Sequence, residues 1–88
     1  MEWNREEIRS RLRHRIGEIA GELGRDPQHL RDDELIPQSG LLDSAGMLSL
    51  IVWCEEEFGV ELLSDEINLD NFGSVARMLD YLDGARSR

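Results

Sequence analysis

Ser44 is the residue whose type and position most suggest chemistry. It follows Asp43 at the end of a long irregular stretch, residues 25–43, and directly precedes the most apolar run of the chain. Irregular stretches of this length are uncommon in small domains unless they serve a function. A serine before an apolar helix is ordinarily a cap, so its type alone assigns it no reaction. A serine nucleophile would need a basic partner, and the sequence offers only His14 and His29 and no lysine, which argues against a serine enzyme.

The other groups that could do chemistry form no recognisable site. The two histidines have no carboxylate or cysteine at metal-ligand spacing, so a zinc or iron site has little support. Cys54 is the only cysteine, which excludes an internal disulfide and a multi-cysteine metal site. The glycines match neither of the common nucleotide-binding patterns. We therefore expect no metal and no catalysis by the chain itself, and we interpret Cys54 as a core residue.

The first half of the chain predicts one long helix and a long loop. The helix runs from about residue 4 to residue 23, because five apolar residues at helical spacing share one face: Ile8, Leu12, Ile16, Ile19 and Leu23. Gly24 is a typical helix end, and Pro27 prevents simple continuation. Residues 25–43 have no sustained period and are expected to form a loop that packs onto the core.

The second half predicts two more long helices and a short one. The second helix spans about residues 44–58, a short third one lies near 65–70, and the last runs from Ser74 to about Asp83–Gly84. The tail, residues 85–88, is expected to be frayed. No segment alternates with the period of a strand, so the sequence predicts a single all-α domain over residues 1–88. Its expected architecture is a small four-helix bundle of three longer helices and one short one.

The second predicted helix carries two adjoining apolar arcs. One is the natural core face: Met47, Leu50, Ile51, Cys54 and Phe58. The other is formed by Ala45, Leu48 and Val52. The helix is therefore either buried on most sides or carries an exposed patch for a partner. Trp53 falls near the polar side, where either a loop or a partner would cover it.

Charge is distributed unevenly along the chain. Residues 1–31 carry a net charge of +1 and residues 32–88 carry −10, within a total of −9. This field repels nucleic acid and attracts basic protein surfaces. The longest nearly apolar stretch has only eight residues, so no membrane span is expected. The charged N-terminus lacks a secretory signal, which predicts a cytoplasmic location, and we expect a monomer.

Two motifs flank the second predicted helix and together resemble a known family. The helix opens with Gly40-Leu41-Leu42-Asp43-Ser44-Ala45-Gly46 and closes with Glu55-Glu56-Glu57-Phe58-Gly59. In a small acidic helical chain this combination resembles the acyl carrier proteins, including the peptidyl and aminoacyl carrier domains. The resemblance covers most of the chain, from the first amphipathic helix to the last.

The resemblance implies that Ser44 receives 4′-phosphopantetheine from coenzyme A through a separate phosphopantetheinyl transferase, with Asp43 as its companion residue. The arm ends in a thiol, so cargo would travel as a thioester. An acyl or aminoacyl ligase would load it, and downstream transferases or synthases would receive it. The second helix would be the recognition element, with an apolar patch and an acidic rim: Ala45, Leu48 and Val52 in the patch, Glu55 and Glu56 in the rim.

Three positions depart from the fatty-acid carriers. Ala45, Gly46 and Ser49 stand where those often have a larger apolar residue and early acids. A small residue followed by Gly46 is more similar to the discrete D-alanyl and other aminoacyl carriers, and a specialised-metabolite pathway fits equally. The expected function is a discrete acyl or aminoacyl carrier. The alternative is an unmodified acidic adaptor that acts only through protein binding.

Overall fold

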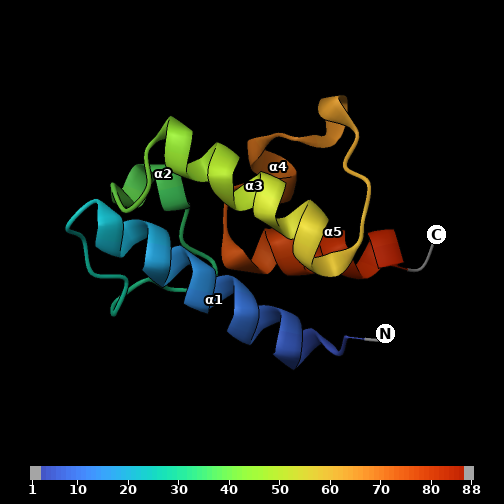
Figure 1. Ribbon diagram of the computed structural model, residues 1–88, viewed down its shortest axis with the longest axis horizontal. Helices are drawn as coiled ribbons and strands as arrows, with labels where there is room; N and C mark the ends of the chain where they lie inside the picture. The colour runs from blue at the N-terminus through green and yellow to red at the C-terminus, as the bar shows by residue number, and fades with distance from the viewer. Residues whose placement is uncertain (1–2, 87–88) are drawn as a thin grey trace.

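The computed structural model describes residues 3–86, which contain helices and no strand (Figure 1). Three long helices form the body of the molecule: α1 (Arg5–Glu22), α3 (Ser44–Phe58) and α5 (Val75–Arg86). The connections contain two single-turn helices, α2 (Ile36–Ser39) and α4 (Leu69–Phe72), and a 3₁₀ turn, η1 (Ser64–Glu66). The predicted all-α class with three longer helices is therefore confirmed, and the short elements number more than the single one expected.

α1 begins and ends close to the predicted positions. Asn4 caps it, because its side-chain oxygen accepts a hydrogen bond from the Glu7 amide at 2.8 Å. Leu23, predicted on the apolar face, is 39 % exposed because it lies in the turn that closes the helix. The other predicted face residues are buried and form the α1 side of the core: Ile8, Leu12, Ile16 and Ile19.

The long connection between α1 and α3 packs onto the core as predicted, and it contains the short helix α2, which the spacing did not indicate. Asp32 accepts hydrogen bonds from two guanidinium groups of α1, those of Arg9 at 2.6 Å and Arg13 at 2.9 Å. The Ile36 amide donates to the Gly73 carbonyl at 2.8 Å, between α4 and α5. The middle of the connection is therefore held by groups distant in sequence.

The predicted short helix near residues 65–70 is two separate turns, η1 and α4. Asn68 lies between them and caps α4, since its side-chain oxygen accepts from the Asn71 amide at 3.0 Å. Gly73 follows α4 directly, and a Cβ atom there would collide with the Leu69 carbonyl oxygen. The tight junction between α4 and α5 therefore requires a glycine.

α5 begins at the predicted position but ends later than predicted. The Ser74 hydroxyl accepts a hydrogen bond from the Arg77 amide at 3.2 Å, as expected of a cap. The helix continues through Gly84 to Arg86, so the predicted end at Asp83–Gly84 is wrong. A single glycine costs only about 1 kcal/mol inside a helix and does not end it unaided. Ala85 and Arg86, expected to be frayed, are thus helical, and Ser87 and Arg88 lie outside the described residues.

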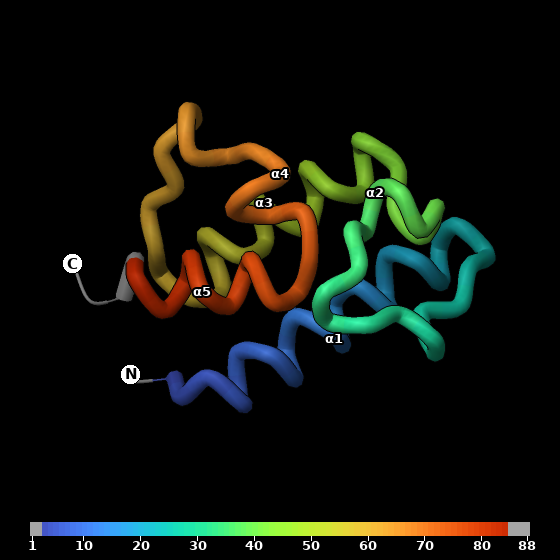
Figure 2. The backbone as a smooth tube through the Cα atoms, turned by 180° about the vertical axis from the view of Figure 1, so that it is seen from behind, coloured from blue at the N-terminus to red at the C-terminus, as the bar shows by residue number. Residues whose placement is uncertain are grey.

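The core lies where α1 meets α3 and α5 (Figures 1 and 2). α1 packs against both of these helices, and α4 packs against α5. Leu50 of α3 and Met78 and Leu82 of α5 are fully buried there. Within residues 3–86, none of the helices has both the length and the apolar character needed to cross a bilayer. This packing leaves one side of α3 facing α1 and another facing α2 and α4.

Candidate functional site

Two polar residues at the start of α3, Asp43 and Ser44, have different structural roles. Asp43 is the N-cap: its backbone is extended, and its Oδ1 atom accepts a hydrogen bond from the Gly46 amide at 2.7 Å. Ser44 is the first residue of the helix and is exposed. The helix therefore does not need the Ser44 hydroxyl as a cap, which leaves that oxygen available for chemistry.

Gly46 allows this turn to lie close against α1. It is buried, and a Cβ atom on it would lie 3.3 Å from both Asp43 Oδ1 and Ile19 Cγ2 and 3.4 Å from Leu42 Cβ. These distances are tighter than ordinary van der Waals contact. The glycine that departs from the fatty-acid pattern therefore has a structural use, because it brings the capped turn onto the core.

The first turn of α3 also suits a negatively charged group. The opening amides of a helix have no partner within the helix, and the helix dipole places partial positive charge at this end. Asp43 engages the Gly46 amide, and the Met47 amide bonds to the Asp43 carbonyl at 2.9 Å. The amides of Ser44 and Ala45 come before the amides of Gly46 and Met47 and lie at the N-terminal end of the helix. A phosphate ester on Ser44 would lie where the helix stabilises it.

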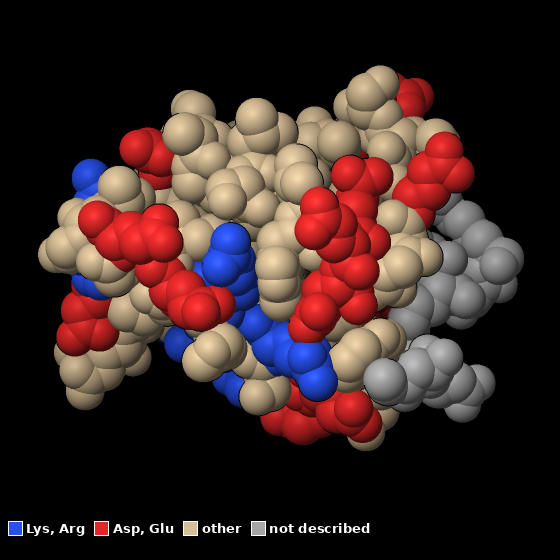
Figure 3. All heavy atoms as spheres, in the orientation of Figure 1, with Lys and Arg blue, Asp and Glu red and all other residues tan. Residues whose placement is uncertain are grey.

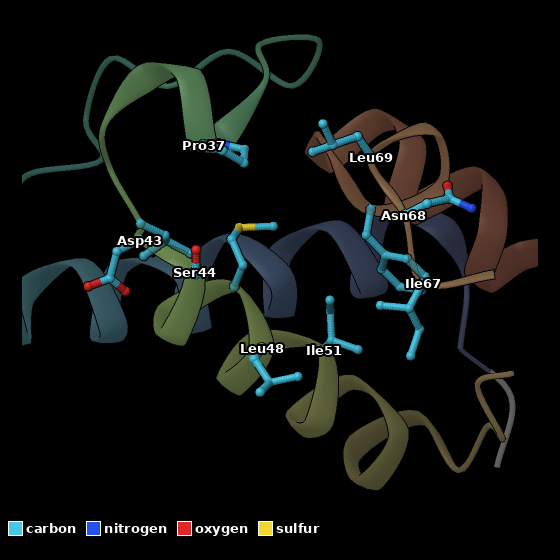
Figure 4. Close-up of a pocket in the computed structure, with 11 residues that line it drawn as sticks. Pro37, Asp43, Ser44, Leu48, Ile51, Ile67, Asn68 and Leu69 are labelled. Carbon is cyan, nitrogen blue, oxygen red and sulfur yellow. The ribbon is translucent and has the colours of Figure 1, made fainter. Parts of the chain in front are cut away.

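A groove of about 550 Å³ opens beside Ser44, between α3 and the short helices (Figure 4). Figure 4 shows the Ser44 side chain pointing toward this space and the Asp43 carboxylate pointing away from it. We call it the Ser44 groove. Its apolar walls come from four segments: α2 (Pro37), α3 with the residues just before it (Leu42, Met47, Leu48 and Ile51), the connection before α4 (Ile67), and α4 (Leu69 and Phe72). The sequence did not indicate this groove, because its walls are distant along the chain and follow no common period.

Comparison with known proteins identifies the family. A model of the family described as the phosphopantetheine attachment site matches residues 8–82. The chain belongs to the acyl carrier protein family. It is also 27% identical over 84 residues to the acyl carrier protein of Micrococcus luteus, across 96% of this chain and 98% of that protein. The cofactor of the carrier is therefore 4′-phosphopantetheine, and its partners are modifying and biosynthetic enzymes.

The carrier offers residues that fit this cofactor. The group supplies a flexible arm with a terminal thiol, and its attachment needs an accessible hydroxyl. Ser44 is exposed, free of the capping task, and next to a largely apolar groove. Within residues 3–86, no three histidine, cysteine or acidic side chains come together as a metal site would require.

The second apolar arc of α3 is exposed in the carrier. Leu48 is 60 % exposed and Val52 is 45 % exposed, and Ala45 is exposed as well. This excludes the alternative that the core buries Leu48 and Val52. On the first arc, Met47 is only half-buried and lines the Ser44 groove. The remaining members of that arc are buried as predicted: Leu50, Ile51, Cys54 and Phe58.

The three glutamates at the end of α3 have different surroundings. Glu55 Oε2 accepts a hydrogen bond from the Leu62 amide at 3.2 Å, and Glu57 forms an ion pair with Arg11 of α1 at 2.6 Å. Glu56 is exposed. Glu57 therefore helps hold α3 on α1, and Glu56 is the most accessible acid of the run.

Trp53 lies between α3 and α1, and its neighbour Cys54 lies in the core. Trp53 is half-buried beside α1, and its ring contacts the Phe58 ring edge-on at 5.5 Å. The sequence left open whether a loop or a partner covers Trp53, and in the structure α1 covers part of it. Cys54 is fully buried, as predicted, and burial raises the pKa of its thiol to about 12.

Proposed function

We propose that the chain is a discrete carrier that bears 4′-phosphopantetheine on Ser44 and presents an acyl or aminoacyl thioester to partner enzymes. The observation that carries this proposal is the division of tasks at the start of α3. Asp43 caps the helix, and the Ser44 hydroxyl is exposed beside the groove. A phosphopantetheinyl transferase can therefore reach the hydroxyl without unfolding the helix.

The Ser44 groove supports the second part of the proposal. A largely apolar surface next to the attachment residue offers the arm and its cargo a place to lie against the carrier, partly shielded from water. The groove is open, so the arm can also leave it and enter the active site of a partner. Both states are required of a carrier that protects a thioester between enzymes and then delivers it.

The exposed apolar arc of α3 supports docking of those enzymes. Ala45, Leu48 and Val52 form an exposed apolar patch, and Glu55 and Glu56 form its acidic rim. With a net charge of −9, the carrier attracts basic surfaces of the transferase, the loading ligase and the downstream transferases or synthases. We infer a cytoplasmic, monomeric carrier whose cargo is set by these enzymes.

The intact mass of the chain isolated from its own cells tests this function. A carrier is expected to show the mass of one phosphopantetheine plus a cargo, and hydroxylamine, which cleaves thioesters, should remove only the cargo. The Ser44→Ala chain should show neither mass and should not support its pathway. An unmodified mass together with a functional Ser44→Ala chain would contradict the carrier and leave a protein adaptor.

A further inference from the structure

A second groove, of about 450 Å³, lies along α3 on the side that faces α1. We call it the Arg15 groove, because Arg15 of α1 closes one side of it. The residues of α3 that line it are Ala45, Leu48, Ser49, Val52, Trp53 and Glu56. It therefore includes the whole exposed apolar patch and ends at an exposed acid. The residue from α1 was not among the predicted docking residues.

Arg15 is the only cation among the described residues that line this groove, and its guanidinium is incompletely paired. Its Nη1 atom lies 3.5 Å from Glu18 Oε1, which is a loose ion pair, and its Nε atom is buried without an acceptor among the described residues. A buried donor without an acceptor lowers stability. The side chain is 30 % exposed, so a docking protein can reach its outer edge.

The charge around the groove is mixed rather than uniformly acidic. Figure 3 shows basic side chains exposed between clusters of acidic ones on the face that carries α1 and α3. A partner surface with basic residues alone would be attracted by Glu56 and repelled by Arg15. The surface that fits has an apolar side chain for the groove, a cation for Glu56 and a carboxylate for Arg15.

We propose that the Arg15 groove receives an apolar side chain of the phosphopantetheinyl transferase, and that a carboxylate beside that side chain pairs with Arg15. This inference rests on the proposed function, because the transferase must approach Ser44 and the groove starts at the next residue, Ala45. The guanidinium presents parallel N–H donors that match a carboxylate. The pair therefore selects a transferase of matching charge pattern and sets its orientation on the carrier.

Transfer kinetics with coenzyme A, magnesium and the phosphopantetheinyl transferase from the chain's own organism test the contact. Arg15→Met keeps the apolar stem and removes the charge, and Arg15→Glu reverses the charge. The control is Arg31→Glu, because Arg31 is 77 % exposed in the loop and its guanidinium pairs with Asp33, two residues away. We expect the KM for the carrier to rise about threefold in Arg15→Met and tenfold or more in Arg15→Glu, with kcat unchanged within twofold and the control within twofold of wild type.

A spectroscopic measurement detects binding at the groove in the absence of the transfer reaction. The chain has two tryptophans, so Trp3→Phe leaves Trp53, on the groove wall, as the only site for 5-fluorotryptophan. Adding the unlabelled transferase without coenzyme A should shift or broaden the single fluorine resonance. The same addition should have a much weaker effect on the Arg15→Met form.

Two results would overturn the inference. One is a KM for Arg15→Met equal to that of the wild type. This result decides the question even if Arg15→Glu fails to fold, which the melting curve of Arg15→Glu would reveal. The other is a Trp53 resonance that a saturating amount of transferase does not move. Either result with a normally modified wild-type chain rejects the groove contact alone, whereas a wild-type chain that is never modified rejects the proposed function.

Discussion

At the residue scale, the start of α3 depends on which of two adjacent polar residues caps the helix. Both residue types are good caps, so the sequence limits the cap to Asp43 or Ser44 and does not choose between them. The choice depends on backbone conformation: Asp43 is extended, and its carboxylate reaches the Gly46 amide. The sequence therefore predicts Ser44 as the attachment residue, but the reason why its hydroxyl is available could not be predicted.

Replacing each of the two residues by alanine should separate their roles. We expect Asp43→Ala to lower the free energy of unfolding by about 1 kcal/mol, because it removes the cap. Ser44→Ala should change it by less than about 0.5 kcal/mol, since an exposed first-turn residue makes no such contact. Urea unfolding monitored by circular dichroism measures both. A loss in Ser44→Ala as large as that in Asp43→Ala would show that Ser44 is a cap after all.

Cys54 should be chemically silent in the native protein. Burial raises the pKa of its thiol to about 12, so almost no thiolate is present at pH 8, and the side chain is also shielded from reagents. We expect no reaction with a disulfide reagent at pH 8 under native conditions and one equivalent after unfolding in denaturant. Because the unfolded thiol has the lower pKa, this group also favours unfolding as the pH rises above 9. Rapid labelling of the native protein would contradict the assigned core face.

At the element scale, the long helices could be predicted, whereas the short ones could be predicted only in part: a short helix was expected near residues 65–70, where η1 and α4 lie, and α2 was not expected. α1, α3 and α5 each carry enough apolar residues to show a helical period. The elements α2, η1 and α4 have three or four residues each, too few to show any period. Long-range contacts hold them, such as the bond from the Ile36 amide to the Gly73 carbonyl. These contacts join residues that only the folded chain brings together. The same is true of the Ser44 groove, which α2 and α4 complete.

The connection between α1 and α3 should lose stability in acid. Hydrogen bonds and charge from Arg9, with charge from Arg13, hold the pKa of Asp32 below its usual value. A carboxylate whose pKa is lowered by folding contributes stability above its unfolded pKa and loses it as the pH falls through the folded pKa. Asp32→Asn should therefore be less stable than wild type at pH 7, and the difference should shrink as the pH falls below 4.

Thermal melts of Asp32→Asn and wild type between pH 2 and pH 7 measure this difference. Asp33→Asn is the control, because its side chain is 69 % exposed and its ion pair is with Arg31, two residues away. The control should follow the wild-type curve. A constant difference between Asp32→Asn and wild type at every pH would show that the ionised carboxylate contributes nothing.

At the scale of the whole molecule, two grooves lie along α3 and share Leu48: one opens beside Ser44 toward α2 and α4, and the other lies on the side of α1. Spacing left open whether the core buries the second apolar arc, although the arc itself could be predicted, because Ala45, Leu48 and Val52 recur at helical intervals. The two grooves could not, because each depends on which segments lie against α3. The sequence therefore indicated the apolar faces of α3 and not the shape of the surfaces around it.

The overall negative charge should control how fast partners arrive. We expect Glu56→Arg to slow association with the transferase about tenfold at low salt, because it reverses an exposed charge on the proposed docking surface. Glu61→Arg makes the same change in net charge on an exposed loop residue beyond α3 and should have a smaller effect. In stopped-flow measurements at increasing salt, the association rates of the two variants should converge. Equal rates for the two variants at low salt would mean that only net charge matters.

The mass of the purified chain after incubation with coenzyme A, magnesium and a phosphopantetheinyl transferase tests the central claim most directly. The account predicts a gain of one phosphopantetheine in the wild type, located on the peptide that contains Ser44, and no gain in a folded Ser44→Ala chain. A folded wild-type chain that gains no mass, or a Ser44→Ala chain that still gains it, would contradict the account.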